Sequence, residues 1–199
     1  MGRALGQIDT RKDEAILDAA SQLFGSRGLA VPMDEIARVA GVSKQTLYNR
    51  YSSKVEIARA VAARRSEAIS APLMTDGQPV EVLAALAEGL LEKLTCPDAA
   101  NSLRAASLAS IEAPELGRAV YEAGPAEGRR KLAQWLTAQT GLGLLKVDDP
   151  VQAAEMFSGM VLGHGHLRGL LGLQGIDPAT AKSRARECAE RFVRAFAPD

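Results

Sequence analysis

The sequence has few of the residues that build β-sheets, disulfide frameworks or membrane spans. Aromatic residues make up only 4% of the chain, alanine is abundant and runs of β-branched residues are nearly absent, so the composition favours helices over sheets. The two cysteines, Cys96 and Cys188, stand far apart, which favours free thiols over a disulfide. No segment approaches the roughly 20 uncharged apolar residues that a membrane-spanning helix needs.

The sequence also lacks the signatures of an enzyme or an exported protein. It has no nucleophile elbow, no phosphate-binding glycine loop and no cluster of metal ligands. His164 and His166 are two apart, and such residues on a helix point about 200° away from each other, so they do not chelate one ion. The charged amino terminus has no apolar core like that of a signal peptide. We expect a cytoplasmic protein with no catalytic residue, metal or cofactor.

The charges are balanced overall but are unevenly distributed along the chain. Lys and Arg number 24, as do Asp and Glu, which gives a formal net charge of zero. Residues 1–65 hold eleven basic and seven acidic residues, a net charge of +4, and the remaining residues carry −4. Because phosphate neutralisation dominates nucleic-acid affinity, only the first third of the chain suits a polyanion.

A helix-turn-helix pattern is present at residues 33–51. Ala37, Gly41 and Leu47 stand at the spacing of this motif, in which Ala37 and Leu47 let the two helices touch. Gly41 supplies the positive φ that ends the first helix, and Ser43 is expected to cap the second. The second helix carries polar side chains that can bond base edges and phosphates in a major groove. The pattern therefore predicts a DNA-binding unit.

Apolar residues recur at helical spacing along most of the chain. The predicted helices span about 10–27, 34–40, 44–50, 53–70, 80–94, 98–112, 115–123, 126–140, 151–173 and 178–197. Thr10 with Asp13, and Ser53 with Glu56, resemble capping boxes that open the first and fourth of these helices. We expect an all-α fold of about nine or ten helices. Prolines and a glycine at 72–79 interrupt the pattern and predict a domain boundary near residue 72.

The amino-terminal residues resemble TetR-type transcriptional regulators. The matching positions are Ile16–Ala20, Leu23, Phe24, Gly28, Met33–Ala37, Ala40–Lys44, Thr46–Tyr48, Tyr51, Ser53 and Lys54. The resemblance implies a homodimer that binds a roughly palindromic operator on double-stranded DNA and usually blocks transcription. It also implies release when a small molecule enters the carboxyl-terminal helical domain. The expected domains are residues 1–71, with the helix-turn-helix and a connecting helix, and residues 72–199, for effector binding and dimerisation.

The residues expected to contact DNA cluster on the second helix of the motif and the start of the next one. They are Ser43, Lys44, Gln45, Thr46, Tyr48, Asn49, Arg50 and Lys54. Gln45 and Thr46, on the first turn, are best placed for base edges, and Asn49 for either a base or a phosphate. Lys44, Tyr48 and Arg50 are placed to hold phosphates. Lys54 begins a helix, where its charge, the free backbone amides and the helix dipole favour a phosphate oxygen.

Four positions in this region depart from the family's pattern. Arg50 stands where many members have His, and Tyr51 where the family usually has Phe. For Tyr51 core packing is the favoured role. Val31 and Pro32 stand where members commonly have a Thr or Ser and one more residue, so the usual hydroxyl cap of the second helix is expected to be missing, although Pro32 suits a helix start.

The glycine-rich stretch 153–173 is the main feature of the carboxyl-terminal part. Its glycines are Gly159, Gly163, Gly165, Gly169 and Gly172. Each costs a helix interior roughly 1 kcal/mol relative to alanine, so close packing should offset them. In this family the last two helices form the dimer interface, which implies a homodimer through 151–173 and 178–197. Packing within one subunit is the alternative.

An effector cavity is expected among the helices from 80 to 173. The residues expected to line it are Leu103, Leu108, Trp135, Met156, Phe157 and Met160, with a filled core as the alternative for each. Two other classes of function are alternatives to the repressor. The first is a helical interaction module with a protein partner, which would have no need for the phosphate-directed Lys44, Arg50 and Lys54. The second is an enzyme, which would have to show turnover that a mutation in the pocket abolishes.

Overall fold

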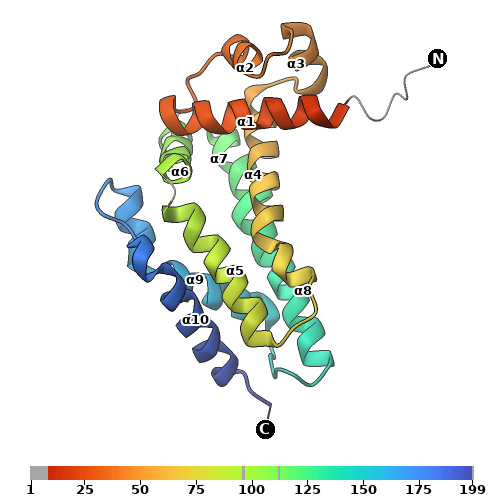
Figure 1. Ribbon diagram of the computed structural model, residues 1–199, viewed down its shortest axis with the longest axis vertical. Coiled ribbons are helices and arrows are strands. Elements are labelled where there is room, and N and C mark those ends of the chain that lie inside the picture. Colours follow the sequence, from red (N-terminus) through yellow and green to blue (C-terminus); the bar gives the residue numbers. More distant parts are fainter. Residues whose placement is uncertain (1–8, 96, 112, 199) are drawn as a thin grey trace, which may run out of the picture. The chain divides into compact units, whose positions relative to one another are not determined.

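The computed structural model describes residues 9–95, 97–111 and 113–198, which form helices and no strand (Figure 1). The α-helices are α1 (Asp9–Arg27), α2 (Met33–Val39), α3 (Lys44–Arg50), α4 (Lys54–Ser70), α5 (Pro79–Thr95), α6 (Pro97–Ala109), α7 (Pro114–Tyr121), α8 (Glu127–Gly141), α9 (Pro150–Leu170) and α10 (Pro178–Ala195). A 3-10 turn, η1 (Ala71–Met74), follows α4, and a π-helical turn, η2 (Glu122–Ala126), joins α7 to α8. The all-α prediction is confirmed. None of these described helices is long and apolar enough to cross a membrane.

Two helix starts were predicted from capping boxes, and one prediction needs correction. Asp9 already belongs to α1, so Thr10 lies inside the helix and is not its N-cap. At the start of α4, the Glu56 N–H donates to Ser53 Oγ over 3.3 Å. The Glu56 carboxylate accepts from the Ser52 N–H at 2.6 Å, which lowers the pKa of Glu56. The second box is therefore formed, with its return bond shifted by one residue.

The chain packs as two units. The first contains the chain up to Ala63 together with Pro97–Ala123, and the second contains Arg64–Cys96 and Gly124–Asp199. Residues 97–123 belong to the first unit because α6 packs against α1 and α7 against α6. Periodicity along the sequence does not reveal this return of the chain. The functional division into residues 1–71 and 72–199 stays a prediction, since packing contacts do not test it.

The core of the first unit joins α2 and α3 to α1. Ile36, Ala37 and Leu47 are at most 1% exposed, so α2 and α3 meet through the side chains that the spacing indicated. Gly41, in the turn between them, has φ of +66°, and Gly28, after α1, has φ of +73°. Both are conformations that a residue without Cβ adopts at little cost. The predicted helix-turn-helix is thus formed.

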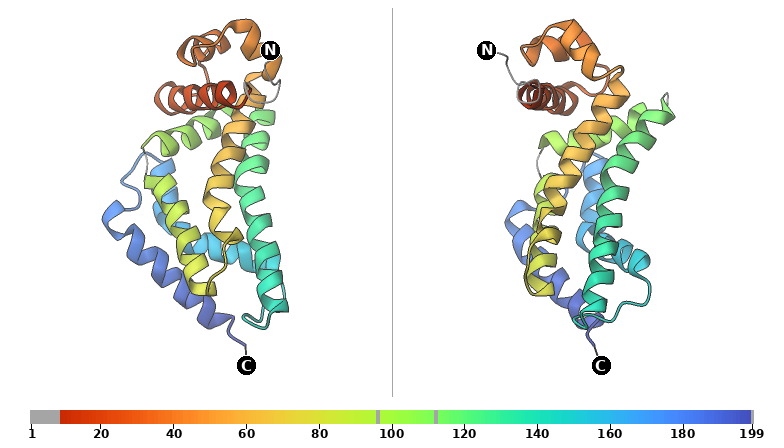
Figure 2. Two further views of the ribbon diagram at one scale, coloured as in Figure 1. Left: turned by 45° about the vertical axis from the view of Figure 1, so that its right-hand side comes forward. Right: turned by 90° about the vertical axis from the view of Figure 1, so that its right-hand side faces the viewer.

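The second unit is built around α5 and α10, which lie side by side (Figure 2). Its core includes an aromatic group in which the Phe157 and Phe192 ring centroids are 5.1 Å apart, and those of Phe192 and Phe196 are 4.6 Å apart. Cys188 is buried beside them as a free thiol, and burial raises its pKa. Cys96 lies outside the described residues.

Helix α9 is broken at Gly163, where φ is +50° and ψ is −160°. The break frees carbonyl groups of the preceding turn, and the Arg184 side chain on α10 binds two of them. Its Nε donates to the Val161 carbonyl at 2.8 Å and its Nη2 to the Met160 carbonyl at 2.9 Å. A Cβ at Gly163 would lie 2.5 Å from Arg184 Nη2, and one at Gly165 would lie 2.2 Å from the Ile176 side chain. These two glycines therefore pack within the chain, which is the alternative left open by the sequence.

Candidate DNA-binding site

Helix α3 is held at its start by Ser43 and along its inner face by Leu47. The Thr46 N–H donates to Ser43 Oγ at 3.0 Å, and the two hydroxyl oxygens lie 2.8 Å apart. This N-cap confirms the predicted start of the helix. Leu47 is fully buried against α2, so the opposite face of α3 points to solvent.

The outward face of α3 presents amide and hydroxyl groups. Gln45 and Asn49 are exposed, and Gln45 Nε2 donates to Asn49 Oδ1 at 2.7 Å, one helical turn away. This bond leaves the Gln45 carbonyl as an acceptor and the Asn49 amide as a donor. Thr46 is half-buried beside the cap. Such groups match the donors and acceptors on base edges, so this face can read a major groove.

Lys44 is exposed and forms an ion pair with Asp34 on the first turn of α2. The hydrogen bond that the Lys44 ammonium donates to the Asp34 carboxylate is the main reason why the pKa of Lys44 is raised. A lysine ammonium has three N–H donors, so this contact leaves two for a phosphate. Tyr48 is also exposed, at 48%, whereas Tyr51 is half-buried and packs against the core of its unit.

Arg50 occupies a different environment from the other expected DNA contacts. Its side chain is 14% exposed, and its Nη1 lies 2.7 Å from Asp13 Oδ2 on α1. This ion pair ties the last turn of α3 to α1, which gives Arg50 a role in positioning the helix. Its expected phosphate contact stays a prediction. Sequence reasoning missed Asp13 and Asp34 as partners because no local spacing rule links residues on different helices.

Lys54, at the start of α4, is half-buried and donates from Nζ to the Leu29 carbonyl at 2.7 Å. Burial removes part of the water around the Lys54 ammonium and thereby lowers its pKa. An anion bound beside the ammonium would stabilise its charged form. Pro32 is the N-cap of α2 and makes no side-chain cap, as the departure from the family's pattern suggested. Neither Val31 nor Pro32 has a hydroxyl group that could cap α2.

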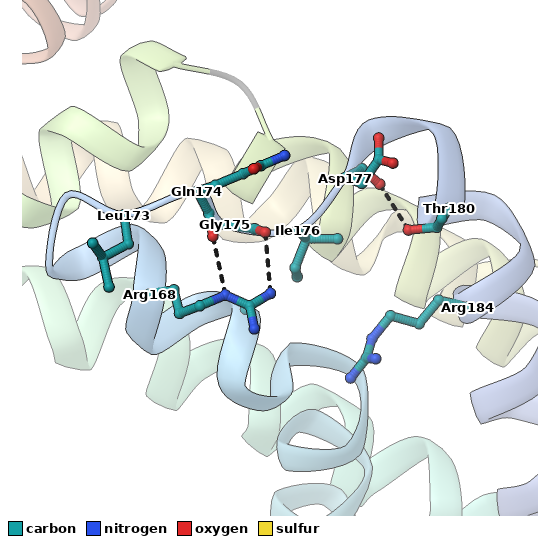
Figure 3. A pocket seen from close by; sticks show the side chains of 9 residues that line it. Arg168, Leu173, Gln174, Gly175, Ile176, Asp177, Thr180 and Arg184 are labelled. Atoms are coloured by element: carbon teal, nitrogen blue, oxygen red, sulfur yellow. Dashed lines mark hydrogen bonds between the residues drawn. The ribbon is translucent and has the colours of Figure 1, made fainter.

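The residues expected to line an effector cavity lie in different environments. Trp135 and Phe157 are 8% and 0% exposed and belong to the core of the second unit. Leu108, Met156 and Met160 are exposed at 64%, 54% and 37%. The side chain of Leu103 lies outside the described residues. None of the six lines the cavity at the α9–α10 connection, which is shown in Figure 3.

No metal site is present in the described ranges: no three His, Cys, Asp or Glu side chains there are grouped to hold an ion. His164 is exposed and His166 is half-buried, and burial lowers the pKa of His166.

Comparisons with known proteins match both parts of the chain. Residues 16–61 match the family described as bacterial regulatory proteins, tetR family. Residues 81–198 match the carboxyl-terminal domain of AefR-like transcriptional repressors. The transcriptional activator FasR of Mycolicibacterium smegmatis is 49% identical over 57 residues, which are 28% of this chain. The alignment spans only 26% of the length of FasR.

Solved structures resemble the chain over nearly its whole length. A regulator from Mesorhizobium loti assigned to the TetR family superposes with a TM-score of 0.78 at 27% identity, covering 94% of this chain and 97% of that one. The flavonoid-responsive regulator FrrA superposes with a TM-score of 0.68 at 31% identity, covering 94% and 98%. Together with the matched domains, these likenesses show that the chain belongs to the TetR family of transcriptional regulators.

Proposed function

We propose that the protein is a homodimeric repressor that binds a palindromic operator through α3 and is released from it by a small molecule. The observation that carries this proposal is the exposed polar face of α3, with Gln45 and Asn49 opposite the buried Leu47. In a symmetric dimer, two such helices enter successive major grooves about 34–36 Å apart. Lys44, Tyr48, Arg50 and Lys54 supply phosphate contacts, and Ser43 and Thr46 complete the contact surface.

The dimer forms through residues 151–173 and 178–197. On the first part of α9, Val151, Met156 and Met160 are exposed at 71%, 54% and 37%. A Cβ added at Gly159 would meet nothing within 4 Å, so a second helix can approach closely there. Burial of exposed apolar side chains is the usual source of dimer stability.

Repression is favoured over activation because the repressor-type domain matches residues 81–198, whereas the likeness to the activator FasR covers 57 residues. The effector binds in the second unit, in the cytoplasm, and favours a dimer in which the recognition helices have a different separation. FrrA is flavonoid-responsive by its name, so flavonoids are a reasonable first panel of effectors. No catalytic step is needed for this function.

The test is selection of bound sequences from a random pool of double-stranded DNA by the purified full-length protein. The affinity for the enriched sequence is then measured at two salt concentrations. A palindromic sequence whose affinity falls with salt is expected, because phosphate contacts release counterions. If no sequence is enriched, and DNA affinity is independent of salt, the protein-partner alternative replaces this proposal.

The effector part of the proposal is tested separately on the enriched operator. A panel that begins with flavonoids is titrated into the complex, and loss of operator binding is followed by fluorescence anisotropy. If DNA binding is established and no compound in a broad panel changes operator affinity, regulation by an effector fails and an unliganded DNA-binding role survives.

A further inference from the structure

The connection between α9 and α10, residues 171–177, is packed tightly onto α9. Gly165 gives it room, since a Cβ at that position would lie 2.2 Å from the Ile176 side chain. A Cβ at Gly175 would lie 3.7 Å from the Cα of Gly169 and 3.4 Å from the Gly165 carbonyl oxygen. The glycines of this region therefore allow two backbone segments to pack closely, and the connection has a defined shape.

Two arginines hold this region together. Arg168 donates from Nε to the Gln174 carbonyl at 3.0 Å and from Nη2 to the Gly175 carbonyl at 3.3 Å. Arg184 donates in the same manner, from Nε and Nη2, to the two carbonyls freed by the break in α9. In each case the contacts use the Nε side of the guanidinium. The opposite edge, formed by Nη1 and the second N–H of Nη2, is left for another acceptor.

A cavity of about 530 Å³ lies between these arginines (Figure 3). It is lined by Gly165, Arg168, Leu173, Gln174, Gly175, Ile176, Asp177, Thr180 and Arg184. Its volume is in the range of small-molecule sites, and Leu173 and Ile176 provide apolar surface.

The charges around the cavity favour an anion. Neither Arg168 nor Arg184 forms an ion pair within the part of the chain that the structure describes. Asp177 is the single acidic residue of the lining, and its Oδ1 already accepts the Ala179 N–H at 2.9 Å as the N-cap of α10. Two guanidinium charges and one carboxylate leave a net positive charge.

We propose that this cavity binds a small organic carboxylate, with the carboxylate on the arginines and an apolar body against Leu173 and Ile176. A carboxylate accepts two parallel N–H bonds from the end of a guanidinium, and this geometry is both strong and selective. A cation is repelled, and a neutral amide of the same shape has no negative charge and only one acceptor oxygen for a guanidinium. The site is distinct from the residues expected for the effector, and its existence does not depend on operator binding. Five of its lining residues lie in the ranges proposed for the dimer interface, so the proposal requires that the cavity stay open to solvent in the dimer; they are Gly165, Arg168, Leu173, Thr180 and Arg184.

The experiment is calorimetric titration of the full-length protein with benzoate, and with benzamide as the neutral match. Benzoate is expected to bind, and Arg168→Gln is expected to weaken its binding about tenfold or more, because a charge-assisted bidentate contact is lost. Arg191→Gln is the matched control, since Arg191 lies on α10 and is paired with Glu187 away from the cavity. Circular dichroism and light scattering check that each variant keeps its fold and oligomeric state.

A second measurement on the unaltered protein covers the case in which Arg168→Gln does not fold. Amide chemical shifts are followed during the benzoate titration, and the changes are expected at residues 165–184. Equal affinity for benzoate and benzamide, undiminished benzoate binding by folded Arg168→Gln, or shift changes confined to other residues would each overturn the proposal. None of these outcomes bears on operator binding, which is measured separately.

Discussion

Helices α3 and α9 both expose a face to solvent, but the two faces have opposite chemistry. On α3, Gln45 and Asn49 are exposed and only Leu47 is buried, so a single apolar side chain holds a polar surface in place. On α9, Phe157 is fully buried while Met156 and Met160 remain exposed. Exposed amides suit a polar groove, whereas exposed methionines suit an apolar partner.

The two helices also differ in how they are stabilised. Helix α3 has seven residues; its start and its inner face depend on the Ser43 cap and on Leu47, which are close in sequence, and the Arg50–Asp13 ion pair adds one contact to α1. Helix α9 has 21 residues, and its break at Gly163 depends on Arg184, which lies on another helix. Substitutions in α3 should therefore lower stability mainly by removing a contact close in sequence, such as that of Leu47. Substitutions in α9 should lower it by disturbing a contact between residues distant in sequence, such as Gly163 and Arg184.

The strongest test of the anchor is Leu47→Ala. Removal of a fully buried leucine should lower the free energy of unfolding of the first unit by about 2–5 kcal/mol and abolish DNA binding. Tyr48→Ala, at a 48% exposed position, is the matched control and should leave stability within about 0.5 kcal/mol. Urea denaturation followed by circular dichroism measures both. Equal stability of the two variants would contradict the role of Leu47.

The break in α9 is tested by Gly163→Ala with Gly141→Ala, outside the proposed dimer interface, as its control. A residue with Cβ at φ of +50° and ψ of −160° is strained, and its Cβ meets Arg184, so a loss of about 1–3 kcal/mol is expected. A Cβ at Gly141, the last residue of α8, would meet nothing within 4 Å, so its replacement should stabilise α8 by up to about 1 kcal/mol. Denaturation midpoints give the difference, and stabilisation by both variants would show that α9 is not broken in solution.

The proposed dimer interface also includes Gly163, which packs against Arg184 of its own chain. Because Gly163 is needed for the fold of one subunit, its replacement does not report on the interface alone. Met156→Glu is the cleaner variant and should raise the dimer dissociation constant about tenfold or more, since an exposed apolar contact gains a charge. Leu144→Glu, 43% exposed and outside the proposed interface, is the control. Analytical ultracentrifugation that finds both variants equally dimeric would exclude Met156 from the interface.

The sequence predicted the parts of the molecule that local rules govern. Gly41, Ser43 and Leu47 do what their spacing indicates, because turns, caps and short helix contacts involve residues close in the chain. The ion pair of Arg50 with Asp13 could not be predicted, since those residues are far apart in sequence and are brought together only when the first unit folds. The DNA contacts themselves stay predictions.

The carboxyl-terminal part was less predictable for a related reason. The glycines of α9 were recognised as unusual, but the sequence did not show that Arg184 and Ile176 would occupy the space beside two of them. The expected effector residues divide between core and surface because apolar type alone does not distinguish a cavity wall from a filled core.

The last prediction distinguishes phosphate contacts from base contacts in DNA binding. Its main readout, the salt dependence of affinity, is expected to change only slightly. Lys54→Ala should weaken binding to all DNA sequences similarly and reduce the slope of log affinity against log salt by about one unit, because one phosphate contact is lost. Gln45→Ala is the matched variant and should relax sequence preference, costing roughly 1–3 kcal/mol on the enriched operator and little on random DNA. Since Lys54 also binds the Leu29 carbonyl, Lys54→Arg is included to retain the charge and should restore the salt slope. The reverse pattern, with sequence preference lost in Lys54→Ala and the salt slope lost in Gln45→Ala, would mean that α4 reads the bases and α3 only holds the backbone.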